Sequence, residues 1–143
     1  MPHVLVVDDD PAICTVIRIW LEKEGFEVTT ADGTVSGLTA LDSATFDLMI
    51  VDIFMPGMRG FESVRTFHQR AMNVPLIAIS GYAFASSRTP APDFLRMTLE
   101  LGAAQCLRKP FKPATLLAVV NNCLKDFTPH SAATPSEGAR KMQ

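Results

Sequence analysis

The sequence has no surplus of basic residues: 13 of its 143 residues are Lys or Arg and 15 are Asp or Glu, which gives a formal net charge of −2. A segment that binds nucleic acid usually carries a basic patch, so we do not expect that function here. No apolar run approaches the roughly 20 residues that a bilayer-spanning helix needs, and no basic stretch precedes the first apolar run. We therefore expect a cytoplasmic protein that does not bind a membrane.

Cysteine and histidine are also scarce. The three cysteines are an odd number, lie far apart and form no Cys-x-x-Cys pair, so we interpret them as small buried hydrophobic residues. The three histidines share no regular spacing with each other or with an acid, which argues against a histidine metal site or catalytic site. These residues are Cys14, Cys106, Cys123, His3, His68 and His130.

Apolar runs of strand length alternate with segments of helical periodicity. Five such strand–helix units predict an α/β fold, a doubly wound parallel sheet with helices on both faces. The length fits one domain, expected at residues 1–127, and the Ser-, Thr-, Ala- and Pro-rich residues 128–143 are expected to form a flexible tail or linker. The expected strands span 4–7, 26–30, 47–51, 74–79 and 106–108, and the expected helices span 11–24, 35–41, 61–70, 94–101 and 113–124.

Carboxylates follow two of the strands that we expect in the centre of the sheet. Asp8 and Asp9 come directly after the first strand, and Asp52 comes directly after the third. Functional sites of such sheets lie beyond the carboxyl ends of the strands, so these acids should be close together. Neighbouring carboxylates repel one another unless a cation lies between them, and hard oxygen ligands suit Mg²⁺, with Mn²⁺ as a substitute. The sequence therefore predicts a metal site that includes Asp9 and Asp52.

Two more polar residues, Ser80 and Lys109, end the fourth and fifth strands. Each feature alone has an ordinary structural explanation, since an acid can cap a helix and a Ser-Gly pair can form a turn. Together they are typical of phosphoryl transfer. Asp52 can act as a nucleophile that becomes an acyl phosphate, and Mg²⁺ can neutralise charge on the transferred group. The Ser80 hydroxyl and the Lys109 ammonium can then contact two phosphoryl oxygens.

With these residues in order, the sequence resembles the receiver domain of two-component response regulators, whose simplest member is the chemotaxis response regulator. The resemblance covers roughly residues 3–125. It is carried by the segments Val6–Asp10, Val51–Met58, Ile79–Gly81 and Lys109–Phe111. It implies a flavodoxin-like sheet of strand order 2-1-3-4-5.

The resemblance also implies a role for each site residue. Asp52 would be the phosphoacceptor, Ser80 the switch hydroxyl and Lys109 the family's lysine. Asp9 and the backbone carbonyl of Phe54 would bind the metal directly. Asp8 would act mainly through water.

The implied function is signalling rather than enzymatic turnover. A sensor histidine kinase or a phosphotransfer protein would donate the phosphoryl group, and the face formed by the fourth helix, fifth strand and fifth helix would change to signal a protein target or an output domain. Dimerisation through the same face is a further implication. The sequence fits either a stand-alone receiver or a fragment of a longer regulator.

The sequence departs from the family pattern at three places. Cys106 stands three residues before Lys109, where the family usually has an aromatic switch residue, and Arg59 stands where an acid is common. The segment between Ser80 and Lys109 is several residues longer than usual, with the excess in Ala83–Pro92. We expect Cys106 to occupy the switch position and signalling to use an altered entrance to the fourth helix.

Three other interpretations compete with this one. A phosphohydrolase of the haloacid dehalogenase type would use an Asp-x-Asp pattern such as Asp8–Asp10, but it needs an acidic motif after the lysine, and only two isolated acids follow Lys109. A flavodoxin-like binding module needs a Ser/Thr/Gly-rich loop after the first strand to hold phosphate, and three carboxylates stand there. A degenerate receiver that serves only as an interaction surface would not need all the chemical positions, which are filled here.

Overall fold

A five-stranded parallel sheet forms the centre of the computed structural model, which describes residues 1–53, 55, 62–80 and 97–126. The strand order is β2-β1-β3-β4-β5, and every neighbouring pair is parallel. The predicted fold class and the strand order implied by the resemblance are both confirmed. The elements are β1 (His3–Val7), α1 (Pro11–Lys23), β2 (Glu27–Ala31), α2 (Thr34–Ser43), β3 (Leu48–Asp52), α3 (Glu62–Arg70), β4 (Leu76–Ser80), β5 (Gln105–Arg108) and α6 (Pro113–Asp126).

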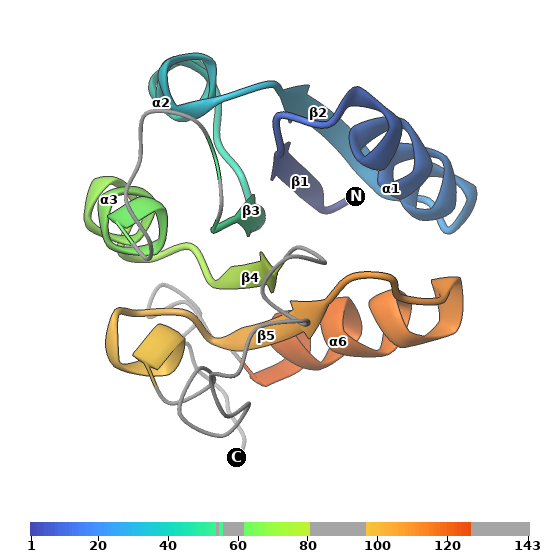
Figure 1. Cartoon of the computed structure of the whole chain (residues 1–143). Helices are drawn as coiled ribbons and strands as arrows, with labels where there is room; N and C mark the ends of the chain where they lie inside the picture. The colour runs from blue at the N-terminus through green and yellow to red at the C-terminus, as the bar shows by residue number, and fades with distance from the viewer. Residues whose placement is uncertain (54, 56–61, 81–96, 127–143) are drawn as a thin grey trace, which may run out of the picture.

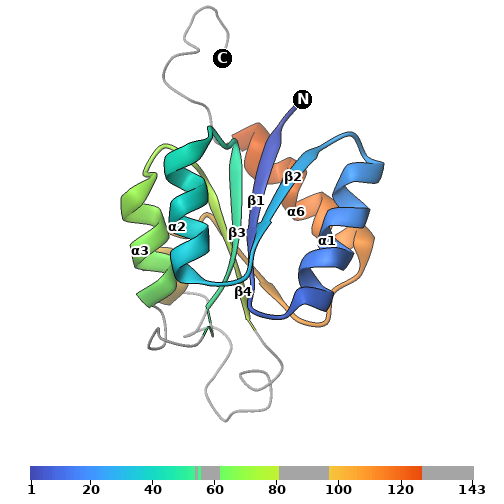
Figure 2. The same ribbon diagram turned by 90° about the horizontal axis from the view of Figure 1, so that it is seen from above.

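The helices cover both faces of the sheet, with α1 and α6 on one face and α2 and α3 on the other (Figures 1 and 2). Successive side chains of a strand point to opposite faces, so each central strand supplies both layers of the core. In β1, Val4 and Val6 pack in the layer under α1 and α6, whereas Leu5 and Val7 pack in the layer under α2 and α3. All residues of β3 and β4 are buried, which agrees with the unbroken apolar runs of these segments.

Local signals in the sequence set the ends of α1. The Asp10 carboxylate accepts a hydrogen bond from the Ala12 N–H at 3.0 Å, and Pro11 is the first helical residue. Gly25, with φ of +94°, follows the helix in a conformation that other residues rarely adopt. An N-cap carboxylate, a proline in the first turn and a glycine after the last turn therefore set the limits of this helix.

Several predicted features lie wholly or partly outside the described residues. These are Phe54, Arg59, the Ala83–Pro92 segment, residues 128–143 and the first three residues, 94–96, of the helix expected at 94–101. Residues 97–100 of that helix are helical. Among the described helices, none combines the length and the apolar character needed to cross a bilayer.

Candidate functional site

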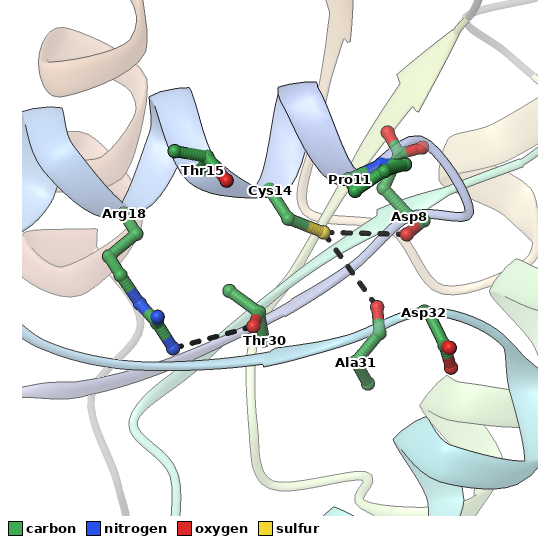
Figure 3. A pocket seen from close by; sticks show the side chains of 8 residues that line it. All are labelled: Asp8, Pro11, Cys14, Thr15, Arg18, Thr30, Ala31 and Asp32. Carbon is green, nitrogen blue, oxygen red and sulfur yellow. Dashed lines mark hydrogen bonds between the residues drawn. The ribbon is translucent and has the colours of Figure 1, made fainter.

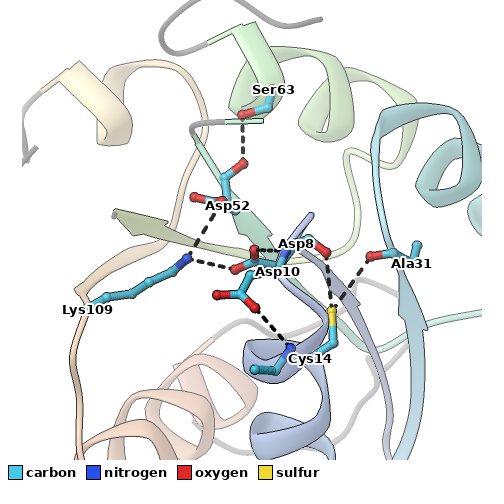
Figure 4. Close-up of polar contacts among 8 residues, drawn as sticks. Asp8, Asp10, Cys14, Ala31, Asp52, Ser63 and Lys109 are labelled. Carbon is cyan, nitrogen blue, oxygen red and sulfur yellow. Dashed lines mark hydrogen bonds and ion pairs between the residues drawn. The ribbon is translucent and has the colours of Figure 1, made fainter. Parts of the chain in front are cut away.

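The carboxyl ends of β1, β3, β4 and β5 bring the predicted site residues to one edge of the sheet. Figure 4 shows three of them, Asp8, Asp52 and Lys109. Asp52 and Ser80 are the last residues of β3 and β4, while Asp8 and Lys109 come directly after β1 and β5. Asp8, Asp52 and Ser80 are buried, with exposed fractions of 0, 3 and 0%, whereas Asp9 is exposed. The cluster therefore combines buried polar groups with one carboxylate that faces solvent.

The three acids that were predicted to lie close together do so. One carboxylate oxygen from each of Asp8, Asp9 and Asp52 lies within 4.8 Å of the other two. Mg²⁺ binds oxygen ligands at about 2.0–2.1 Å, so ligand atoms on opposite sides of the ion are roughly 4 Å apart. The spacing and the hard oxygen donors fit this ion with a small adjustment. The position of Phe54, whose carbonyl was predicted as a further ligand, lies outside the described residues.

Lys109 forms ion pairs with two of these acids. Its Nζ lies 2.9 Å from Asp8 Oδ2 and 3.7 Å from Asp52 Oδ2. Burial alone would lower the pKa of Lys109, but the hydrogen bond to Asp8 and the charges of Asp52 and Asp8 together raise that pKa above its ordinary value. The Lys109 backbone N–H also donates to the Ser80 carbonyl at 2.9 Å, so the lysine is anchored to the end of β4.

Both carboxylate oxygens of Asp8 already have partners within the protein. The Asp10 backbone N–H donates to Oδ1 at 2.9 Å, and the Lys109 ammonium lies beside Oδ2. These contacts hold the carboxylate in one orientation and direct it toward the lysine. Among the described residues, the Asp9 carboxylate has no partner that would hold it away from the other two acids.

The Ser80 hydroxyl is buried and has no hydrogen-bond partner among the described residues. Leaving such a group unpaired costs free energy, so an unpaired buried hydroxyl at a site calls for an explanation. Because Ser80 is the last residue of β4 and its carbonyl is bonded to the Lys109 N–H, its side chain stands at the same edge as the acids. A phosphoryl oxygen could serve as the missing partner.

Cys106 lies on β5 opposite Ala78, the residue two positions before Ser80 on β4. Its thiol is half-buried and packs against the layer under α2 and α3. Burial raises the pKa of this thiol to about 11, although its hydrogen bond to Thr98 and the charge of Arg108 both act to lower that pKa. Cys106 thus connects β5 to the helical residues 97–100, where Thr98 is fully buried.

Two contacts to the site were not predicted from the sequence. The Ser63 hydroxyl on α3 donates to the Asp52 backbone carbonyl at 3.2 Å. The one sequence signal for this contact was that Ser63, a polar residue, lies next to Val64 and on the same helix face as Phe67. The Cys14 thiol donates to the Asp8 carbonyl at 3.4 Å, at the edge of a hollow of about 150 Å³ between α1 and the end of β2 (Figure 3).

Cys14 and Cys123 are buried, as expected of small hydrophobic residues, and Cys106 is partly buried. All three cysteines are free thiols. Burial, followed by the charge of Asp8, raises the pKa of the Cys14 thiol to about 11, so it remains protonated at neutral pH.

Comparisons with known proteins agree with this geometry. The family model described as the response regulator receiver domain matches residues 4–121. Response regulator SaeR of Staphylococcus aureus is 33% identical over 126 residues, which cover 87% of this chain and 51% of SaeR. The chain thus spans about half the length of the curated relatives it matches.

Solved structures show the same likeness. A CheY-like receiver domain protein of Methanospirillum hungatei is 29% identical, with a TM-score of 0.76 over 88% of this chain and 95% of that one. Chemotaxis protein CheY4 of Vibrio cholerae is 31% identical, with a TM-score of 0.72 over 85% and 98% of the two chains. Full-length FixJ of B. japonicum is 26% identical, with a TM-score of 0.76 over 91% of this chain and 61% of FixJ.

Proposed function

The chain belongs to the response regulator receiver family, which is a family of signalling domains, and on this basis we propose that Asp52 accepts a phosphoryl group from a phosphohistidine. The donor would be a sensor histidine kinase or a phosphotransfer protein. The observation that carries the proposal is the position of the Asp52 carboxylate, which lies 3.7 Å from the Lys109 ammonium and within the cluster of three acids.

The reaction is a displacement at phosphorus. An oxygen of the Asp52 carboxylate forms a bond to phosphorus while the phosphorus–nitrogen bond of the phosphohistidine breaks, and the electron pair of that bond stays on the imidazole nitrogen. Lys109 pairs with one phosphoryl oxygen, because its ammonium already stands between Asp8 and Asp52. Ser80 donates its buried hydroxyl to another phosphoryl oxygen and so gains the partner that it lacks.

Mg²⁺, or Mn²⁺ in its place, would neutralise charge on the transferred group when bound. Asp9 and Asp52 would hold the ion directly, together with the Phe54 carbonyl. Asp8 would act mainly through water, as the resemblance implies, with the Asp10 N–H on its Oδ1 and the Lys109 ammonium beside its Oδ2. The formal charge of three carboxylates and one ammonium is negative, which favours a divalent cation.

The signal would leave the site through β4 and β5. When Ser80 moves toward the phosphoryl group, the backbone of β4 and the Lys109 N–H bonded to it are drawn along. Cys106 would carry this change to Thr98 and the helix that contains it, in place of an aromatic switch residue. The face formed by this helix, β5 and α6 would then contact a target protein, an output domain or a second copy of the chain.

A phosphohydrolase of the haloacid dehalogenase type would need its nucleophile after β1. The buried residue there, Asp8, has both oxygens engaged, and the family match does not favour this alternative. A receiver should turn over essentially none of a small phosphomonoester, so sustained hydrolysis that survives Asp52→Asn would contradict the proposal.

Intact-mass measurement after incubation with acetyl phosphate and Mg²⁺ tests the proposed function. We expect the parent protein to gain one phosphoryl group, and we expect EDTA or Asp52→Asn to abolish the gain. Asp42→Asn is a matched control, because Asp42 is an exposed acid that pairs with Arg70 on the surface. An adduct that persists in Asp52→Asn would refute Asp52 as the acceptor.

A further inference from the structure

We propose that Ser63 is a positioning residue for phosphoryl transfer, which orients Asp52 through its backbone; this inference rests on the proposed function. Ser63 lies in the first turn of α3 and is fully buried. Its hydroxyl donates to the Asp52 carbonyl oxygen at 3.2 Å, across a separation of 11 residues (Figure 4).

The environment of Ser63 does not otherwise favour a hydroxyl. Val64 and Phe67 of the same helix are fully buried in the layer under α2 and α3. A buried hydroxyl is costly unless it is hydrogen-bonded, and alanine would serve as well if packing were the only requirement. The hydroxyl contacts the residue proposed to accept the phosphoryl group, which gives it a use that alanine lacks.

The peptide unit between Asp52 and Ile53 is held at both of its ends. On one side, Ser63 donates to the Asp52 carbonyl. On the other side, the Ile53 N–H donates to the Ile79 carbonyl of β4 at 3.0 Å. A planar peptide that is bonded at its C=O and at its N–H cannot rotate without breaking one of these hydrogen bonds.

This restraint bears directly on the Asp52 side chain. The Asp52 Cα is part of the restrained peptide unit, so the orientation of the unit determines the direction in which the carboxylate leaves the backbone. The carboxylate must face Lys109 at 3.7 Å and the two other acids at the same time. Because positioning of a nucleophile contributes strongly to rate, a small rotation of this peptide should slow the transfer.

The test compares Ser63→Ala and Ser63→Cys with Val64→Ala, in the full chain. Cysteine is somewhat larger than serine and only a weak donor, so it weakens the hydrogen bond without leaving a void, and the two Ser63 variants separate loss of the hydrogen bond from loss of volume. Val64 is a buried neighbour on α3 that packs in the core, and its truncation controls for a general loss of stability. Backbone ¹³C′ chemical shifts report the hydrogen bond at Asp52 without any phosphorylation.

We expect both Ser63 variants to shift the Asp52 ¹³C′ resonance and to react with acetyl phosphate about three- to tenfold more slowly at saturating Mg²⁺, which is the rate equivalent of one ordinary hydrogen bond. Val64→Ala should leave the resonance in place and the rate within about twofold of the parent.

Two results would contradict the inference in different ways. If Ser63→Cys reacts as fast as Val64→Ala while the parent takes up the phosphoryl group, Ser63 has only a structural role and the proposed function stands. If the parent itself takes up no phosphoryl group, the proposed function is wrong and the inference falls with it. Should Ser63→Ala fail to fold, the comparison of Ser63→Cys with Val64→Ala still decides the question.

Discussion

Replacing Lys109 with methionine would remove the ammonium group that lies between two buried carboxylates. At an effective dielectric constant of 20, this group attracts Asp8 by about 6 kcal/mol at 2.9 Å and Asp52 by about 4.5 kcal/mol at 3.7 Å. Hydration of the lysine in the unfolded chain offsets much of this attraction. Removing one partner of a buried ion pair nevertheless costs about 3–5 kcal/mol, because the remaining charges stay buried without compensation.

We therefore expect Lys109→Met to lower the free energy of unfolding by about 3–5 kcal/mol in EDTA. Mg²⁺ should stabilise the variant more than it stabilises the parent, since a divalent cation can supply the missing positive charge. Each tenfold gain in Mg²⁺ affinity would add about 1.4 kcal/mol to this stabilisation at saturating concentration. Urea unfolding, followed with and without Mg²⁺, measures both effects.

Lys112→Met is the matched control, because Lys112 is exposed and has no ion pair among the described residues. We expect this control to change the free energy of unfolding by less than about 0.5 kcal/mol. If Lys109→Met unfolds at the same urea concentration as the control, the ammonium does not compensate the buried acids. If Mg²⁺ stabilises Lys109→Met no more than the parent, the acids do not form the cation site.

Two further predictions concern the core and Cys106. Gly37→Ala would place a Cβ 2.7 Å from Phe67 Cζ. We therefore expect this variant to lower the free energy of unfolding, measured in urea, by about 1–3 kcal/mol. The control Thr39→Ala changes an exposed position of the same helix and should change the free energy of unfolding by less than about 0.5 kcal/mol. Burial raises the pKa of the Cys106 thiol from 9.0 to about 11, so the folded state favours the neutral thiol. This contribution to the free energy of unfolding is fully present below pH 9.0 and is lost as the pH rises through about 11. Alkylation of Cys106 by iodoacetamide, mapped by peptide mass, should therefore still rise about tenfold per unit between pH 8 and 10, and a plateau near pH 9 would contradict the burial of this thiol.

The sequence was sufficient to predict the sheet and the proximity of most of the candidate site residues. Buried parallel strands appear as continuous apolar runs, and the carboxyl ends of such strands meet at one edge of the sheet. Acids, a serine and a lysine at those ends therefore had to be neighbours. The structure places Asp8, Asp9 and Asp52 together and sets Lys109 against two of them, as this reasoning requires.

The contacts that orient the site could not be predicted in the same way. The hydrogen bond from Ser63 depends on how α3 packs against the end of β3, and a serine in the first turn of a helix usually has a local role. The link between Cys106 and Thr98 depends on the distance between β5 and the preceding helix. The limits of strands also shift by one or two residues, as at β4, which begins at Leu76 rather than at Val74.

The most direct test of the account is to locate the phosphorylated residue. Borohydride reduces an aspartyl phosphate to homoserine, so reduction of the protein after phosphorylation, followed by peptide mass mapping, marks the acceptor. We predict homoserine at position 52 when the donor is either acetyl phosphate or a phosphohistidine protein. Homoserine at position 8 or 9, with Asp52 unmodified, would contradict the account and would place the nucleophile after β1.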